Sequence, residues 1–151
     1  MIESHPLASG EHVGIAALGD DRLFVSLGAG YYGYAEDDVA VGPGGIVSFD
    51  SGTADVLVIS GIRSGEFVAS RLSLETGDNY GGLNQLIAHG QRAVVATGWR
   101  GSLTVIDASE ADLPRVVRDV AVTGYVQDLG IVGNTVVAAL GYDGVTTIEL
   151  E

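Results

Sequence analysis

The chain contains no cysteine, which excludes disulfide bonds and zinc sites built from thiolates. It contains no lysine either: its seven basic residues are all arginines, set against 20 acidic residues, and its formal net charge is −13. A chain this acidic repels the phosphate backbone, so nucleic acid is not an expected partner. The charge is typical of a highly soluble protein, and a cationic partner or a divalent metal is the alternative explanation.

Long hydrophobic runs are also absent. No segment reaches the roughly 18 apolar residues of a membrane-spanning helix. The first ten residues, MIESHPLASG, lack the basic and apolar regions of a signal peptide. We therefore expect a soluble chain without a membrane span or a signal peptide, and the residues themselves do not indicate a compartment.

Glycine is abundant, with 23 residues among 151, whereas proline occurs only three times. Hydrophobic residues make up 46% of the chain, and many of them are β-branched and stand in short runs between glycines. This composition is typical of a folded all-β protein with many tight turns. We expect one domain that covers residues 1–151.

An internal repeat runs through the chain. Three segments align on a glycine that follows an apolar run, with one extra residue in the first turn: HVGIAALGDDRLFVSLG (12–28), LNQLIAHGQRAVVATG (83–98) and VQDLGIVGNTVVAALG (126–141). Each is followed by a third apolar run that ends in an acidic residue: IVSFD (46–50), LTVID (103–107) and VTTIE (145–149). Each is preceded by a further element: IESHPLASG (2–10), EFVASRLSLETG (66–77) and RVVRDVAVTG (115–124).

Each repeat therefore predicts four short strands in the order d–a–b–c, over residues 2–50, 66–107 and 115–149. The spacing from Gly90 to Gly133 fits the roughly 40–45 residues of a four-stranded β-propeller blade. The first repeat is longer, and its extra residues are assigned to the b–c, c–d and d–a connections, where the backbone can stay solvated. The fold prediction is an all-β propeller segment of three four-stranded blades.

The residues VRDVAVTG…DLGIVGNTVVAALGYDGVTTIEL and GSLTVIDASEADLP resemble the LVIVD-type β-propeller repeat. The resemblance covers Leu83 to Leu150 well and the first 80 residues less closely. It implies a propeller, a fold that this repeat often forms in exported or cell-surface proteins. It implies no particular activity, because a fold does not determine a function.

Three blades leave the ring open, since propellers usually have about four to eight. The chain begins with a d strand and ends with a c strand, so its first strand could complete the last blade of another copy. We predict a homodimer that closes a six-bladed ring through two equivalent strand exchanges. The alternative is an excised piece, or one subunit of a larger assembly.

All six tyrosines and the only tryptophan fall on b–c or d–a connections. Because successive strands alternate in direction, these connections emerge on one face of a propeller. Tyrosine, tryptophan and arginine are enriched at binding surfaces, so we predict a site for a protein or glycan partner there. Its candidate residues are Tyr31, Tyr32, Tyr34, Tyr80, Trp99, Arg100, Tyr125 and Tyr142. Packing of the tyrosines on neighbouring blades is the alternative interpretation.

The long loop GAGYYGYAEDDVAVGPGG (28–45) carries three adjacent acidic residues, Glu36, Asp37 and Asp38. Loops of this length in compact domains are usually functional or disordered. Carboxylates are ligands for a hard cation such as Ca²⁺, but the spacing matches no EF-hand, so a solvated acidic loop is the preferred interpretation.

Catalytic motifs are lacking: the chain has no GxSxG, no P-loop and no HExxH. We predict no catalytic residue and no cofactor, and a non-enzymatic binding or assembly module. The alternative function is a metal-assisted hydrolase with its site at the propeller channel. The polar residues that could serve it, near the start of the a strands, are His12, Asn84, Gln127 and Asp128.

Overall fold

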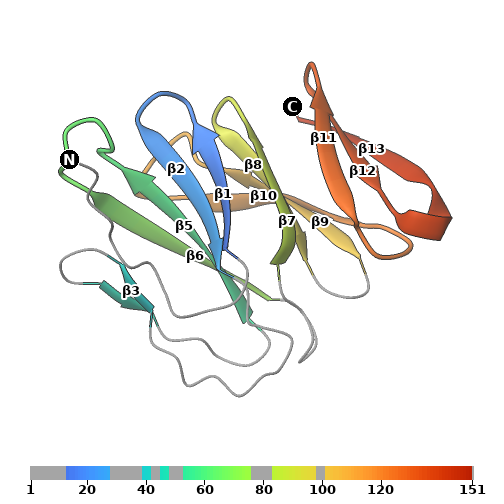
Figure 1. Ribbon diagram of the computed structural model, residues 1–151, viewed down its shortest axis with the longest axis horizontal. Helices are drawn as coiled ribbons and strands as arrows, with labels where there is room; N and C mark the ends of the chain where they lie inside the picture. The colour runs from blue at the N-terminus through green and yellow to red at the C-terminus, as the bar shows by residue number, and fades with distance from the viewer. Residues whose placement is uncertain are drawn as a thin grey trace.

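The computed structural model describes residues 13–27, 39–41, 45–47, 53–75, 83–97 and 101–150. These residues form three antiparallel sheets and one separate hairpin (Figure 1). The first sheet has the order β1 (Val13–Leu18), β2 (Arg22–Leu27), β5 (Thr53–Ser60) and β6 (Val68–Glu75), and the second the order β7 (Leu83–His89), β8 (Arg92–Thr97), β9 (Ser102–Asp107) and β10 (Arg115–Ala121). The third has the order β11 (Asp128–Val132), β12 (Thr135–Ala139) and β13 (Val145–Glu149), and the hairpin pairs β3 (Val39–Val41) with β4 (Gly45–Val47). The prediction of an all-β fold is confirmed.

The three repeat glycines form the turn of the first hairpin in each sheet. Gly19, Gly90 and Gly133 have φ angles of 65°, 61° and 62°, in the left-handed region that favours glycine. In the first sheet Leu18 pairs with Arg22, which leaves one residue more in the turn than in the other two hairpins. The extra turn residue predicted from the sequence is therefore present.

The third strand of the first sheet is β5, and the prediction of a strand at 46–50 for this place is wrong. Strand β5 pairs with β2 over residues 55–60 on one side and with β6 along its whole length on the other. Ile46 and Val47 belong instead to β4, in the separate hairpin. The run TADVLVIS is the longer and more β-branched of the two, so it forms the more extensive ladder. The connection from the third to the fourth strand is equally long in the first sheet (61–67) and in the second (108–114). Most of the extra length of the first repeat therefore lies in the connection between β2 and β5.

The second sheet is packed between the other two. Ala93, Val95 and Ile106 belong to one buried cluster, which includes Phe24 and Val58 of the first sheet. Val94, Ala96 and Leu103 belong to a second cluster, which includes Val136 and Ala138 of the third sheet. Neighbouring residues of β8 and β9 therefore face different sheets, as expected for strands covered on both sides. Burial of each large aliphatic or aromatic side chain contributes about 1.5–3 kcal/mol.

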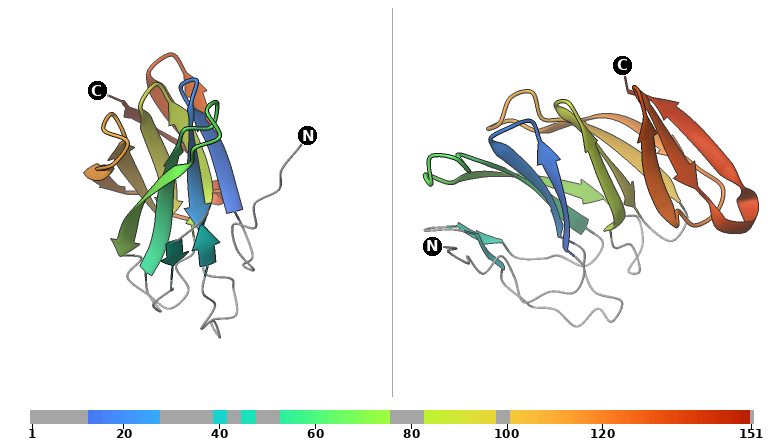
Figure 2. Two further views of the ribbon diagram at one scale, coloured as in Figure 1. Left: turned by 90° about the vertical axis from the view of Figure 1, so that its left-hand side faces the viewer. Right: turned by 45° about the horizontal axis from the view of Figure 1, so that its top comes forward.

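Strand β7 contacts both β1 and β11, so the first strands of the three sheets lie side by side. Segment 66–77 contains β6, the fourth strand of the first sheet, and segment 115–124 contains β10, the fourth strand of the second sheet. Each of these segments begins a predicted repeat whose other strands lie in the next sheet, so one predicted repeat spans two sheets. Four strands are present in two of the sheets and three in the last, and segment 2–10 lies outside the described residues. Over the described ranges the sheets form an open row (Figure 2).

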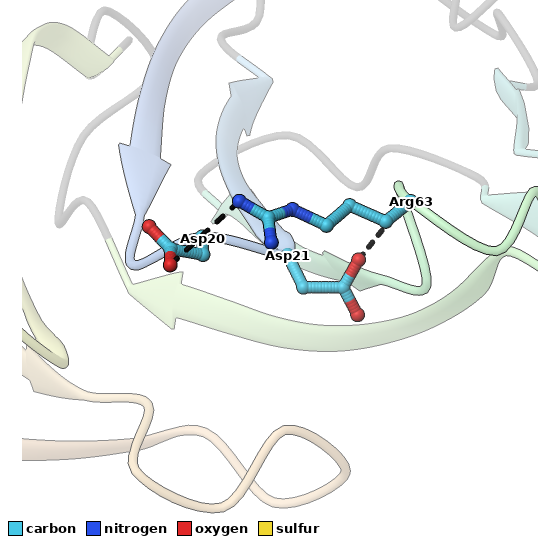
Figure 3. Close-up of polar contacts among 3 residues, drawn as sticks. All are labelled: Asp20, Asp21 and Arg63. Carbon is cyan, nitrogen blue, oxygen red and sulfur yellow. Dashed lines mark hydrogen bonds and ion pairs between the residues drawn. The ribbon is translucent and has the colours of Figure 1, made fainter.

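Polar contacts tie the turns at one end of the sheets. The Asp21 carboxylate accepts a hydrogen bond from the backbone N–H of Arg63 at 2.7 Å, and the Arg63 guanidinium lies 3.7 Å from Asp20 (Figure 3). Both side chains of this ion pair are mostly exposed, so it contributes less than about 1 kcal/mol. Arg22 reaches the next sheet and donates to the carbonyls of Ala108 at 2.7 Å and Ser109 at 3.3 Å.

Within the described ranges, no helix has the length and apolar character that crossing a membrane requires. The one helical element there is a single 3₁₀ turn, η1 (Gly141–Asp143), between β12 and β13.

Candidate binding face

The b–c and d–a connections meet at one end of the sheets, here called the loop end. In the second sheet, Ser102 of β9 pairs both with the last residue of β8 and with the last residue of β10. In the third sheet, Ala139 of β12 pairs both with the first residue of β11 and with the first residue of β13. The loop end thus comprises Gly101 and the connections 122–127 and 140–144. In the first sheet the last residue of β2, the start of β5 and the last residue of β6 lie at one end of the sheet.

Connections from neighbouring sheets interlock at the loop end. The N–H of Val122 donates to the carbonyl of Gly101 at 2.9 Å, and the side-chain amide of Gln85 donates to the carbonyl of Gln127 at 3.1 Å. A Cβ on Gly101 would lie 2.0 Å from the carbonyl oxygen of Gly124, and a Cβ on Gly124 would lie 2.2 Å from a carboxylate oxygen of Asp143. Only glycine permits approaches this close, so these glycines hold three connections together.

Tyr125 and Tyr142 are the two candidate residues that the structure describes, and both are exposed at the loop end. Tyr142 lies in η1, whose backbone is held because the N–H of Leu140 donates to the carbonyl of Gly144 at 2.8 Å. Its ring is fully exposed, on a turn anchored at both ends. Tyr125 follows β10 in the connection that Gly101 and Gly124 hold in place. An exposed ring on a braced turn can contact a partner at a small cost in conformational entropy.

The other candidates lie outside the described residues. They are Tyr31, Tyr32, Tyr34, Tyr80, Trp99, Arg100 and the acidic residues Glu36, Asp37 and Asp38. The strands that flank Trp99 and Arg100, β8 and β9, have these flanking ends at the loop end. His12 is also outside the described residues, and the side chain of Asn84 is not described.

Acidic residues accompany the two tyrosines. Asp128 and Asp143 are exposed at the loop end, and the Asp128 carboxylate accepts a hydrogen bond from the N–H of Leu129 at 2.9 Å. In the part of the chain that the structure describes, no three His, Asp or Glu side chains are grouped so as to hold a metal ion. The chemistry that these residues support is contact with apolar rings and with cationic or hydrogen-bonding groups.

A hollow of about 450 Å³ lies at the opposite end, between the second and third sheets, and sequence reasoning missed it. Its lining consists of His89, Gly90, Gln91, Arg92, Asp107, Ser109, Asn134 and Leu150. Arg92 is the first residue of β8, as Arg22 is the first residue of β2. Between the first and second sheets, Arg22 occupies the position that corresponds to this hollow and donates hydrogen bonds to two backbone carbonyls there. The recurrence of arginine after the turn glycine is the sequence signal that could have revealed it. Arg92 supplies donors and Asp107 an acceptor to this hollow.

The pKa of Asp107 is lowered from its ordinary value of 3.8. The main cause is the hydrogen bond that its carboxylate accepts from the backbone N–H of Ser109, at 2.9 Å, and the charge of Arg115, 3.6 Å away, acts in the same direction. Both interactions favour the ionised carboxylate over the neutral acid.

Asp107 should therefore make stability depend on pH in acid. A carboxyl whose pKa is lowered on folding stabilises the protein above its unfolded pKa, and this contribution disappears as the pH falls through the lowered value. We expect Asp107→Asn to cost about 0.5–1.5 kcal/mol at pH 7 and progressively less as the pH falls below the ordinary pKa of 3.8. Urea unfolding over a series of pH values measures the cost, and a cost that does not change with pH would contradict the assignment.

No family model matches the chain, and the search of curated proteins finds no match. The likeness to LVIVD-type repeats therefore depends on the residues quoted above.

Proposed function

We propose that the chain is a β-propeller segment that acts as a non-enzymatic binding module, with the loop end as its binding face. The observation that carries this proposal is the interlocking of connections from two sheets, which leaves Tyr125 and Tyr142 exposed on braced turns. Rigid aromatic side chains on a held backbone are typical of residues that dominate binding energy.

Three features support the propeller interpretation. Each sheet begins with the same hairpin around a glycine of positive φ, the first strands lie side by side, and the middle sheet is covered on both faces by its neighbours. Stacked antiparallel sheets of three or four strands, generated by a sequence repeat of this length, are the components of propellers. The LVIVD-type resemblance points the same way.

The chemistry of the loop end favours a protein loop or a glycan as partner. Tyrosine rings bury apolar area against a sugar face or an aliphatic side chain while their hydroxyls form hydrogen bonds. Asp128 and Asp143 add negative charge beside Tyr125 and Tyr142, which favours cationic groups on a protein partner and disfavours phosphate.

The test uses two probes, an array of neutral oligosaccharides and a phage-displayed peptide library selected on the wild-type chain. We expect a selected ligand to bind the Tyr142→Ala variant at least about tenfold more weakly, because an aromatic anchor contributes about 1.4 kcal/mol or more. Tyr125→Ala and a deletion of residues 31–38 should weaken binding of the same ligand.

His89→Ala is the matched control, because His89 is exposed at the opposite end, in the hollow. It should leave the affinity unchanged. The proposal is overturned if the selected ligands bind all three loop-end variants as tightly as the wild type, or if His89→Ala alone weakens binding.

A further inference from the structure

The outer edge of β13 is open. In the first two sheets the third strand pairs with a fourth, whereas β13 pairs with β12 only among the described residues. The N–H of Leu150 and the carbonyl of Gly144 bond toward β12, each at 2.8 Å. Because backbone groups alternate along an antiparallel strand, those of Val145, Thr147 and Glu149 point to the open edge. An edge of this kind is a template for a further strand.

One group on this edge already has a partner from the neighbouring sheet. Arg118 of β10 donates a hydrogen bond to the outward-facing carbonyl of Glu149. The amides and carbonyls of Val145 and Thr147 stand farther along the same edge. A pairing strand would therefore meet its first ladder bonds at these two residues.

The third sheet also has an open face, here called the end face. Alternate residues of β12 and β11 pack on the second sheet, and the others face away from it. The centre of the end face consists of Gly130, Val132, Val137, Ala139, Val145 and Thr147, and the same register places Asp128, Thr135 and Glu149 at its margins. Val132 is 73% exposed and Val145 is 66% exposed. The apolar run VVAA within β12 is typical of a strand covered on both faces, as β8 is, so the centre of this face has the composition of an interface.

The first sheet has the complementary surface, here called the start face. Ile15 stands three residues before the end of β1, as Leu86 does in β7 and Leu129 does in β11. Leu86 and Leu129 are half-buried against the preceding sheet, whereas Ile15 is 58% exposed. The same position on the first sheet therefore lacks the neighbour that the other two have. By register Val25 and Leu57 share this face with Ile15, and both are already buried within the chain, so the open part of the start face is its β1 edge.

We propose that two copies of the chain associate head to tail, with the end face of one against the exposed β1 edge of the start face of the other, and that residues 2–10 of the second copy add to β13 as a fourth strand. The two sheet junctions within the chain already join an end-type face to a start-type face, so the junction between copies continues an existing mode of packing. Two equivalent junctions close a ring with twofold symmetry.

Sequence and position favour this occupant. Segment 2–10 precedes β1 as 66–77 and 115–124, which contain β6 and β10, precede β7 and β11. Pro6 within it suits an edge strand, where one N–H needs no ladder partner. The second sheet lies between β1 and β13 in the same chain (Figure 2), so a second copy reaches β13 without crossing it. A second copy also covers the end face, which an isolated peptide strand cannot do.

The first test is the mass in solution. The wild type should sediment at twice its chain mass of 15.5 kDa, and Val145→Asp should weaken association at least about tenfold by placing a charge on the end face. Val68→Asp is the matched control, because Val68 is a strand valine of similar exposure, 59%, away from both faces. A folded wild type that stays monomeric, or equal effects of the two substitutions, would overturn the proposal.

The second test is cross-linking, which the cysteine-free chain makes unambiguous. Protein with Thr147→Cys is mixed with protein carrying one cysteine at Glu3, His5 or Leu7, and the mixture is oxidised. Paired residues of antiparallel strands lie within disulfide range, so we expect a covalent heterodimer for at least one position. A disulfide within one chain of the double variant would show that the chain's own segment is the occupant, and no disulfide at any position would exclude pairing at this edge.

This inference shares the interpretation of the sheets as blades with the proposed function, but it does not use the loop end. Val145 and Thr147 are not among the residues tested for ligand binding. A monomeric chain that binds ligand through Tyr142 would overturn the association alone, and a dimer without a ligand would overturn the binding proposal alone.

Discussion

Replacement of Gly101 by alanine should lower the free energy of unfolding by about 3 kcal/mol or more. Gly101 has a φ of 70°, which costs an L-residue about 1–2 kcal/mol. The new Cβ would also lie 2.0 Å from the carbonyl oxygen of Gly124 and 3.0 Å from a methyl group of Val122. The nearest obstacle is a backbone atom, so relief requires the connection between β10 and β11 to move. Urea unfolding measures the loss.

Gly133→Ala is the matched control for this substitution. Gly133 has a similar φ of 62°, but a Cβ there meets nothing within 4 Å. Only the backbone strain remains, so we expect a loss of about 1–2 kcal/mol. Equal losses for the two variants would show that the close approach at the loop end contributes nothing. The same Gly101→Ala variant should lose ligand affinity, since the displaced connection contains Tyr125.

Replacement of Arg71 by leucine should cost about 3–5 kcal/mol, because it leaves a buried carboxylate without its counter-charge. Asp55 of β5 is fully buried. One of its oxygens accepts a hydrogen bond from the Ser73 hydroxyl at 2.6 Å, and the other lies 2.7 Å from the Arg71 guanidinium without the alignment of a hydrogen bond. The charge of Arg71 therefore compensates an oxygen that no aligned donor among the described residues serves.

Two further variants separate this effect from a general loss of arginine. In the double variant Asp55→Leu/Arg71→Leu both charges are gone, and replacement of a whole buried pair by apolar side chains is often close to neutral. Arg63→Leu removes the exposed pair with Asp20 and should cost less than about 1 kcal/mol. If Arg71→Leu costs no more than Arg63→Leu in urea unfolding, the burial of the Asp55 charge has no energetic weight.

The hairpins of the repeat could be predicted because their signals are local. A glycine between two apolar runs specifies a tight turn, and Gly90 and Gly133 form such turns with the expected register. The third strand of the first sheet could not be placed in the same way. The runs at 46–50 and 53–60 both read as strands, and only the pairing of β2 with β5 distinguishes them.

The candidate site was only partly accessible to sequence reasoning. The antiparallel alternation of strands sufficed to group Tyr125 and Tyr142 at one end, because it follows from chain direction alone. Nothing in the sequence indicated that a carboxylate of Asp143 lies against Gly124, since the two residues belong to connections that meet only when the sheets pack. The hollow beside Arg92 escaped prediction for the same reason: it exists between two sheets and belongs to neither.

By itself, the sequence determined the all-β class, the turn glycines and the exclusion of thiolate chemistry, since these depend on composition and on contacts between near neighbours in the chain. The tertiary structure alone decided which strand completes the first sheet, that the middle sheet is covered on both faces, and that β13 keeps an open edge among the described residues. Such features depend on pairing and packing between distant segments. Alternation of apolar residues selects a strand's faces, but it does not select the strand or the sheet that will cover them.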